Sequence, residues 1–265
     1  MDHPGMLALF DRFERREAMP VGQRLERTAR LVRHVGAPGQ PSWIVWHDLA
    51  DADVDAVIAD EIAYWTALGQ KVEWKFHAHD LPTDLRQRLL AAGFEADEDE
   101  ALMALDLRQA PAWVEADGGH DVRVVGPEGV DDVATVMAGV WPDEVDRFLA
   151  RYRDHGAAAT ERTRFFVGYD GAAPVAAGWT EASGPVTPFL GLWGGSVLPS
   201  HRGRGHYRAV VAARARYARS RGYRFLTVDA GPMSRPILER LGFQRLTTIL
   251  ACTWRPPRPA PVGLR

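Results

Sequence analysis

The sequence contains little of what several protein classes need. Its 265 residues include a single cysteine, Cys252, which excludes an internal disulfide and a cysteine-rich metal centre and fits a reducing compartment. Lys71 and Lys75 are the only lysines among 32 basic residues, and 35 acidic residues give a net charge of −3. Such a balance provides no overall attraction to nucleic acid or to anionic membranes. We therefore expect no metal, no nucleic-acid partner and no membrane partner.

Targeting and membrane signals are also missing. No window of about 20 apolar residues is present, as a membrane-spanning helix needs. The first four residues, Met1-Asp2-His3-Pro4, are not a basic region followed by an apolar stretch, so they do not resemble a signal peptide. We expect a cytoplasmic protein. The hydrophobic content of 46% supports a real core, and the length suits one large or two modest domains. Cys252 is expected in a late strand as a buried structural thiol.

The most informative stretch is Val197 to Tyr207. It follows an apolar run of strand length, Val186 to Leu198, and precedes a segment with apolar residues at helical spacing, Tyr207 to Arg221. A Gly-rich turn between a strand and a helix directs backbone N–H groups and the positive helix end to one place. Gly203 and Gly205 allow positive φ and close approach of an anion. The stretch therefore predicts a phosphate or pyrophosphate site, although both usual nucleotide fingerprints are missing.

These residues resemble the acyl-CoA pyrophosphate loop of the GNAT N-acetyltransferase superfamily. The family pattern [QR]-x-x-G-x-[GA] is read here as Arg202 to Tyr207, with Tyr207 in place of the final small residue. The resemblance continues through a strand at Phe225–Val228, a short helix at Ser234–Leu241 and an L-G-F entry into the last strand at 241–243. It implies acetyl-CoA as co-substrate, bound by Ser196, Val197, Leu198, Arg202, Gly203, Arg204, Gly205, His206 and Tyr207.

The N-terminal part repeats this order in a weaker form. Gly69, a strand, a short helix and Ala92-Gly93-Phe94 mirror Gly222, a strand, a short helix and Leu241-Gly242-Phe243. We therefore expect an α/β (α+β) protein of two tandem GNAT-like units, each with a mixed, mostly antiparallel sheet flanked by helices. The expected boundaries are a degenerate unit at 1–110, a linker at 111–120, a catalytic domain at 121–254 and a Pro-rich, extended tail at 255–265.

Several local expectations follow from periodicity. The segment Met6–Glu17 is predicted as a helix, Arg24–His34 as one strand, and Asp51–Leu68 as a helix with Glu61 on its exposed face. The turn before this last helix, Trp46 to Asp53, has carboxylates and no glycine. Carboxylates cap helices but would repel a pyrophosphate, so the first unit is not expected to bind CoA.

The sequence departs from the family where protons move. The resemblance implies direct attack of an amine on the thioester, helped by backbone groups near Val197 and by a glycine bulge at Gly194-Gly195. Leu238 occupies the position where many family members have a Tyr as the acid, and Gly191 occupies the position where others have a Glu as the base. The weak catalytic candidates that remain are Glu181, Asp229 and Ser234, the last of which is more typical of a helix N-cap. His201 and His206 are expected to be exposed loop residues, and Trp141 and Trp193 are possible walls of a substrate site.

Three hypotheses remain. The leading one is an acetyl-CoA-dependent N-acetyltransferase acting on a small-molecule amine. A non-catalytic CoA-binding or sensor protein is the alternative, motivated by the missing acid and base. The third is nucleic-acid binding through an arginine-rich helix that contains Arg208, Arg214, Arg216 and Arg219. The net charge and the absence of a basic face interleaved with aromatic residues disfavour it.

Overall fold

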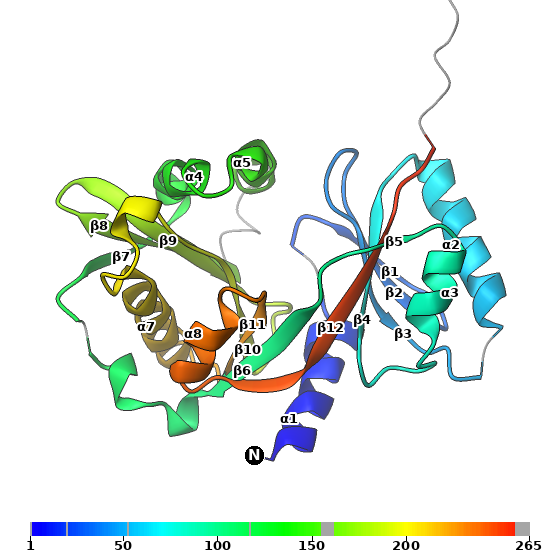
Figure 1. Ribbon diagram of the computed structural model, residues 1–265, viewed down its shortest axis with the longest axis horizontal. Coiled ribbons are helices and arrows are strands. Elements are labelled where there is room, and N and C mark those ends of the chain that lie inside the picture. Colours follow the sequence, from blue (N-terminus) through cyan, green and yellow to red (C-terminus); the bar gives the residue numbers. More distant parts are fainter. Residues whose placement is uncertain (1, 20, 52, 117, 155–161, 258–265) are drawn as a thin grey trace, which may run out of the picture. The chain divides into compact units, whose positions relative to one another are not determined.

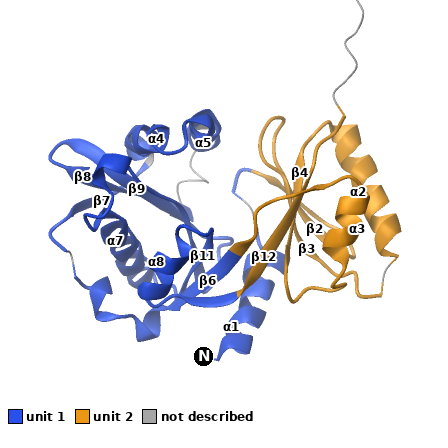
Figure 2. Ribbon diagram, viewed as in Figure 1, with its two compact units in different colours: residues 1–22, 101–246 blue, residues 23–100, 247–265 orange. Residues whose placement is uncertain are grey.

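The computed structural model describes residues 2–19, 21–51, 53–116, 118–154 and 162–257. Most of the expected tail therefore lies outside the described residues. Within the described part of the chain, no helix is long and apolar enough to cross a membrane. The chain divides into two compact units, coloured separately in Figure 2. Unit 1 comprises Met1–Gly22 and Ala101–Leu246, and unit 2 comprises Gln23–Glu100 and Thr247–Arg265. Each unit is thus assembled from two separate stretches of sequence.

Unit 1 contains a six-stranded mixed sheet in the order β6-β11-β10-β9-β8-β7. Only β10 and β11 are parallel, and the other neighbours are antiparallel. The strands are β6 (Glu100–Asp106), β7 (Asp121–Val125), β8 (Thr163–Asp170), β9 (Ala173–Glu181), β10 (Phe189–Val197) and β11 (Phe225–Ala230).

Helices cover both faces of this sheet (Figure 1). They are α1 (His3–Phe10), the π-helix η1 (Asp11–Arg16), α4 (Val130–Ala138), α5 (Val145–Asp154), α7 (His206–Ser220) and α8 (Arg235–Arg240). Short 3₁₀ turns are η2 (Leu107–Gln109), η3 (Ala112–Val114), η4 (Pro127–Gly129), η5 (Pro142–Glu144) and η6 (Pro199–His201).

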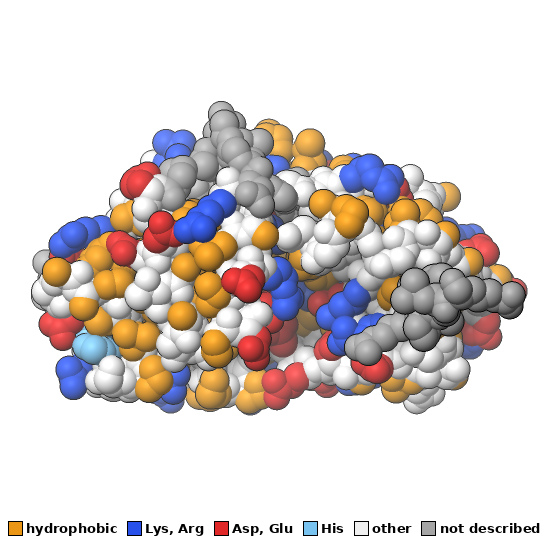
Figure 3. Space-filling model, turned by 90° about the horizontal axis from the view of Figure 1, so that it is seen from above, with side chains coloured by type: hydrophobic (Ala, Val, Ile, Leu, Met, Phe, Trp, Pro, Cys, Tyr) orange, Lys and Arg blue, Asp and Glu red, His pale blue; other side chains and the backbone are white. Residues whose placement is uncertain are grey.

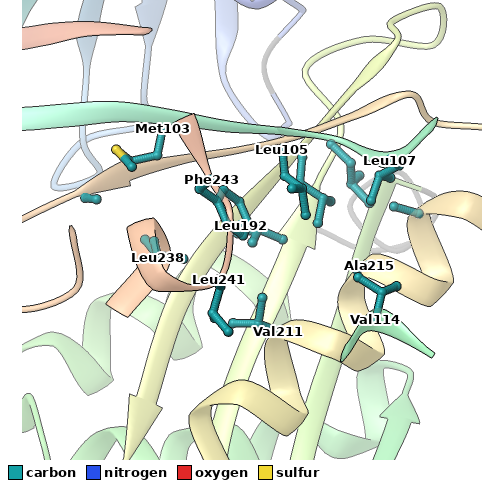
Figure 4. Packing of buried hydrophobic residues seen from close by; sticks show 14 of the residues in the cluster. Met103, Leu105, Leu107, Val114, Leu192, Val211, Ala215, Leu238, Leu241 and Phe243 are labelled. Atoms are coloured by element: carbon teal, nitrogen blue, oxygen red, sulfur yellow. The ribbon is translucent and has the colours of Figure 1, made fainter. Parts of the chain in front are cut away.

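Two apolar clusters pack on opposite sides of the unit 1 sheet. On the α7 and α8 side, Leu192 of β10 packs with Val211 of α7 and Leu238 of α8, as Figure 4 shows. On the α4 and α5 side, Val133 and Phe148 pack with Phe165 of β8. Side chains alternate between the faces of a strand, so residues on either side of Leu192 in β10 face away from α7.

Unit 2 is a smaller version of the same arrangement. Its strands follow the order β1-β2-β3-β4-β12, with β3 and β4 parallel and the remaining neighbours antiparallel. The strands are β1 (Arg24–Arg27), β2 (Leu31–Val35), β3 (Trp43–His47), β4 (Val72–His77), β5 (Glu95–Ala96), which pairs with β12, and the later part of β12 (Gln244–Trp254). Its helices are α2 (Val54–Leu68) and α3 (Leu85–Ala91).

The repeat predicted from the two Gly-Phe pairs is visible in the hydrogen bonds. Gly93 and Gly242 both have positive φ, at 95° and 87°. The N–H of Phe94 donates to Leu89 O at 3.0 Å, and the N–H of Phe243 donates to Leu238 O, also at 3.0 Å. Both helices therefore end in the same Schellman-type turn. The prediction of two units, each with a mixed, mostly antiparallel sheet, is confirmed.

Some local expectations were wrong. The segment Arg24–His34 is a hairpin of two strands, because the Thr28 hydroxyl accepts hydrogen bonds from the N–H groups of Arg30 and Leu31 and turns the chain. Glu61, expected on the exposed face of its helix, is buried, because Arg33 of β2 binds its carboxylate, with Nε and Oε2 2.9 Å apart. Cys252 is buried as expected, and burial raises the pKa of its thiol to about 11.

Candidate active site

The turn before α7 has the geometry of an anion cradle. Gly203 and Gly205 have φ values of 75° and 90°, a region that favours glycine. Gly205 is the N-cap of α7 and provides no side-chain acceptor, so the first amide groups of the helix have no intrahelical or capping partner. A Cβ added at Gly203 would meet nothing within 4 Å, so the turn is open on that side. Arg202 and Arg204 are exposed beside it.

Three histidines pack behind this turn. His120, at the start of β7, makes a hydrogen bond between its Nε2 and Arg204 O at 2.9 Å. Its ring contacts that of His206 at 4.7 Å between centroids, and the His201 ring lies 5.8 Å from that of His206. The expectation of exposed loop histidines was wrong for His206, which is 7% exposed. Burial, and then the neighbouring His120 and His201, lower the pKa of His206, so it supports the turn as a neutral ring.

Beside the turn, β10 and β11 diverge. The parallel pairing covers Phe189 with Phe225, Leu190 with Leu226, and Gly191 with Thr227. Strand β10 continues to Val197, well beyond the last of these pairs. The ladder between β10 and β11 therefore ends at Gly191, and β10 runs on without pairing to β11 toward the Gly-rich turn.

A β-bulge in β10 lies opposite β9 on the other side of this strand. Trp193 pairs with Trp179 and Ser196 pairs with Ala177, so Gly194 and Gly195 together oppose one residue, Gly178. The bulge predicted at these glycines is confirmed. Gly194 has a φ of 56°, and a Cβ there would lie 1.7 Å from the Trp179 ring. A glycine is required at this position by both space and backbone conformation.

Arg214 of α7 binds backbone carbonyls at the bulge. Its side chain is buried, and its Nη1 donates to Trp193 O at 3.2 Å and to Trp179 O at 3.4 Å. Burial lowers the pKa of this guanidinium to about 10. The Tyr207 ring packs beside it, since a Cβ at Gly195 would lie 3.1 Å from Tyr207 Cε2. A buried Arg214 gives no support to nucleic-acid binding through this helix, which the sequence already disfavoured.

The other arginines of α7 do not form a basic face either. Arg216 donates to Val114 O at 2.7 Å, and Arg219 pairs with Glu115. Arg216 and Arg219 therefore serve packing and ion pairing within unit 1. Figure 3, seen from above relative to Figure 1, shows a face on which acidic and basic side chains are interspersed.

The three weak catalytic candidates lie in different settings. Glu181 accepts from Arg151 Nη2 at 3.0 Å and from Tyr152 Oη at 3.2 Å, so its carboxylate is engaged by α5. Asp229 is half-buried near the end of β11. Ser234 occupies the N-cap position of α8 without capping it, because its hydroxyl donates to Gly231 O at 3.3 Å instead. The expected capping role of Ser234 was wrong.

Neither of the two positions where the family has its acid and its base carries a titratable side chain in this protein. Leu238 is fully buried in the cluster on the α7 and α8 side. At Gly191, a Cβ would lie 2.8 Å from Nε1 of Trp193, so the indole covers the place of a side chain. Trp193 is 45% exposed and Trp141 is 36% exposed. Their role as walls of a substrate site stays a prediction.

One further carboxylate was missed by sequence reasoning. Glu14 of η1 accepts hydrogen bonds from the hydroxyl of Ser183 and from that of Thr187, the latter at 2.6 Å. Burial raises its pKa to about 7, partly offset by these two hydrogen bonds, and the charge of Asp229 adds to the rise. A π-helical turn, which is rare and often marks a functional site, was the only signal that could have singled out this segment, and it is not readable from the sequence.

The matching family agrees with this geometry. Residues 131–243 match the model of the acetyltransferase (GNAT) family. The matched segment contains α4 to α8 and the turn described above. Family and fold together support acyl-CoA-dependent acyl transfer.

Solved structures with the same fold cover nearly the whole chain. One is described as a GCN5-related N-acetyltransferase from Kribbella flavida, with a TM-score of 0.67, 15% identity, and coverage of 96% of this chain and 94% of that one. Another is a tandem GNAT protein from the clavulanic acid biosynthesis pathway, with a TM-score of 0.62, 14% identity, and coverage of 92% and 86%. At these identities the likeness establishes the tandem fold alone. A comparison with curated proteins gave no match.

Proposed function

We propose that this chain is an acetyl-CoA-dependent N-acetyltransferase whose acceptor is a small-molecule amine. The observation that carries the proposal is the open N-terminus of α7, lined by Gly203 and Gly205, beside the divergence of β10 from β11. An anionic pyrophosphate suits the first feature because free amide groups and the helix dipole favour negative charge there. The family match to residues 131–243 supports the same ligand.

The residues around this ligand have separable roles. The pyrophosphate is held by backbone amides of Gly203 to Tyr207, with Arg202 and Arg204 adding charge. The extended arm lies along β10, where Ser196, Val197 and Leu198 offer backbone groups. His206 and Tyr207 begin α7 and keep the turn in place through the histidine cluster and the bulge. Acetyl-CoA supplies an acyl thioester, and the protein orients its carbonyl toward the amine.

Positioning accounts for much of the expected rate. Holding two reactants in the right geometry supplies roughly 7–11 kcal/mol of the barrier in well-oriented systems. A preorganised N–H group near Val197 adds electrostatic stabilisation of the carbonyl oxygen as charge develops on it. Direct attack of the amine therefore requires no covalent acyl-enzyme.

The alternative is a protein that binds CoA without turning it over. Leu238 and Gly191, where the family places an acid and a base, favour this second function. Release of free thiol from acetyl-CoA in the presence of an amine panel, measured with a thiol reagent, separates the two. Amine-dependent release supports the enzyme, whereas binding without release for every amine supports the sensor.

Binding itself is tested at Gly205. Replacing Gly205 by Val forces a β-branched residue into a φ of 90° and places its Cβ about 3.1 Å from the His120 ring, so acetyl-CoA binding is expected to be lost. Gly222→Val is the matched control, because Gly222 also has positive φ, at 84°, just beyond the opposite end of α7. Calorimetry that finds binding intact in the Gly205 variant refutes the loop assignment. Two sites per chain would refute the view that unit 2 binds no CoA.

A further inference from the structure

We infer that Glu14, from the N-terminal helical segment, accepts the proton of the acceptor amine in place of the base that β10 lacks. This assignment rests on the proposed function and names a residue for it.

Strand alternation places Glu14 on the face of the unit 1 sheet opposite α7 and α8. Leu190 and Leu192 belong to the cluster on the α7 and α8 side, so Phe189, Gly191 and Trp193 face the opposite side. Phe10 packs on that side, with its ring 5.9 Å from that of Phe189. Glu14 follows Phe10 by four residues, about one helical turn, and therefore lies over the same face.

The adjacent strand β11 gives the same result. Leu226 and Ala230 belong to the α7 and α8 cluster, so Thr227 and Asp229 face the side where Glu14 lies. The charge of Asp229 contributes to the raised pKa of Glu14. By strand alternation, Glu14, Asp229 and Gly191 lie on the same face of the unit 1 sheet.

The carboxylate of Glu14 is held by neutral groups. Ser183 and Thr187, in the segment between β9 and β10, donate their hydroxyls to it. The other titratable neighbours on packed elements are Asp229 of β11 and Tyr223 just before it, whose raised pKa includes a contribution from Glu14. On its own element, Arg15 is paired with Asp11 at 2.7 Å. This carboxylate therefore takes up and releases a proton near neutral pH, as a general base requires.

The remaining candidates are less suitable. Glu181 is bound by Arg151 and Tyr152, which stabilise its charged form and occupy its oxygens. Gly191 has no carboxylate, and the indole of Trp193 lies where one would project. The N-terminal segment thus brings to this face a carboxylate that β10 does not supply.

The proton balance is as follows. Glu14 takes one proton from the protonated amine and passes it to solvent. The neutral nitrogen then forms a bond to the acetyl carbon, the carbon–sulfur bond breaks, and its electron pair leaves on sulfur. The second nitrogen proton goes to that sulfur, which gives the amide, free CoA and one proton released.

The test uses the full-length protein, acetyl-CoA and two amines chosen for their charge, 2-phenylethylamine and aniline. Glu14→Gln keeps a hydrogen-bond acceptor for both hydroxyls but cannot take a proton. For 2-phenylethylamine, which is protonated at neutral pH, kcat/KM is expected to fall by about 10²–10⁴-fold with unchanged affinity for acetyl-CoA. Aniline is already neutral, so its loss is expected to be much smaller. Glu17→Gln, an exposed carboxylate on the same segment, is the matched control and is expected to leave both rates unchanged.

Two further variants give a readout that a purely structural role would not move. Thr187→Val removes a hydrogen bond that lowers the pKa of Glu14, so the acid limb of the pH profile of kcat/KM is expected to move up. Asp229→Asn removes a charge that raises it, so the limb is expected to move down. These shifts test the assignment even if the Glu14 variant does not fold.

The outcomes separate the two proposals. A wild-type protein that binds acetyl-CoA and acetylates no amine in a broad panel overturns the proposed function and this assignment with it. An active wild type with a Glu14→Gln loss below about tenfold overturns the assignment alone. A large loss in Asp229→Asn with an unshifted pH limb assigns the base to Asp229 and also overturns it.

Discussion

The N-termini of α2 and α7 are equivalent places in the two units, but only α2 is capped by a side chain. Each 15-residue helix follows a strand that pairs in parallel with the next one, β3 with β4 and β10 with β11. At α2, Asp53 is the N-cap and accepts from Ala56 N at 3.2 Å. At α7, Gly205 is the N-cap and offers no side chain. The same scaffold is therefore closed by its own carboxylate in unit 2 and left open to an external anion in unit 1.

The strand before each helix shows the same contrast. Both β3 and β10 are irregular against their antiparallel neighbour, at Val32/Arg33 of β2 and at Trp193/Ser196 of β10. A buried charge from each helix lies nearby, Glu61 of α2 bound to Arg33 and Arg214 of α7 bound to backbone carbonyls. In unit 2 the charge is neutralised by a partner side chain. In unit 1 it holds a backbone distortion, so the irregularity is preserved as a shaped site.

Separating the two repeats is expected to have the largest effect. A fragment that begins at Gly118 lacks α1, η1 and β6, and β6 pairs with β11 along six residue pairs of the unit 1 sheet. It also leaves the later part of β12 without β4. We expect an insoluble or unfolded fragment, judged by circular dichroism and size-exclusion chromatography. A soluble fragment with full acetyl transfer would show that the N-terminal residues contribute nothing to the site.

Exchanging the two helix ends tests the comparison directly. Gly205→Asp gives α7 a carboxylate cap like that of α2, and removal of charge-assisted hydrogen bonds worth about 1.5–3 kcal/mol is expected to weaken acetyl-CoA binding by roughly 10- to 100-fold. The reciprocal change, Asp53→Ala, is expected to cost about 0.5–2 kcal/mol of stability with no change in CoA affinity. Calorimetry and denaturant unfolding measure the two. Equal loss of CoA affinity in both variants would contradict the division of roles.

The buried charges differ in what their loss should cost. Glu61→Gln leaves Arg33 with a buried, weakened partner, and breaking such a pair is expected to destabilise the fold by about 3 kcal/mol. Arg214→Met leaves two carbonyls without their donor but also removes a desolvated charge, so the expected cost is about 1–2 kcal/mol. In the Arg214 variant, kcat/KM is expected to fall by a larger factor than the folding equilibrium constant, because the bulge relaxes. Urea unfolding with kcat/KM for the same variants checks both, and an active Arg214→Met protein would remove Arg214 from the site.

Glu14 is also expected to make the stability of the fold depend on pH. Its pKa is raised from 4.5 to about 7, so the folded state binds this proton more tightly than the unfolded state. The resulting stabilisation is complete below pH 4.5 and is lost as the pH rises through about 7. From pH 5 to pH 8 the wild type is expected to lose about 2 kcal/mol from this group. Glu14→Gln should remove that slope, whereas an unchanged slope would mean that another group causes it.

Much of the fold was predictable because its signals are local. The Gly-rich turn, the glycine bulge and both Gly-Phe helix ends depend on residues within a few positions of one another. The parts that sequence missed depend on contacts between distant segments. His120 meets Arg204, Arg214 meets Trp179, and Glu14 meets Thr187 only once the sheet has formed. Burial then changes what each of these polar residues does, and helical or strand periodicity contains no information on that change.

The composition of the units has a consequence for folding during synthesis. The sheet of unit 2 takes one of its strands from residues 247–254, whereas its other strands and both its helices lie within residues 23–100. A ribosome therefore releases most of unit 2 early, but the strand that pairs with β4 emerges last, after the whole of the GNAT domain. Non-local pairing of this kind is slow and leaves strand edges unpaired in the meantime. Unit 2 can therefore complete its sheet only after the residues of unit 1 have been synthesised, and the two repeats do not fold one after the other.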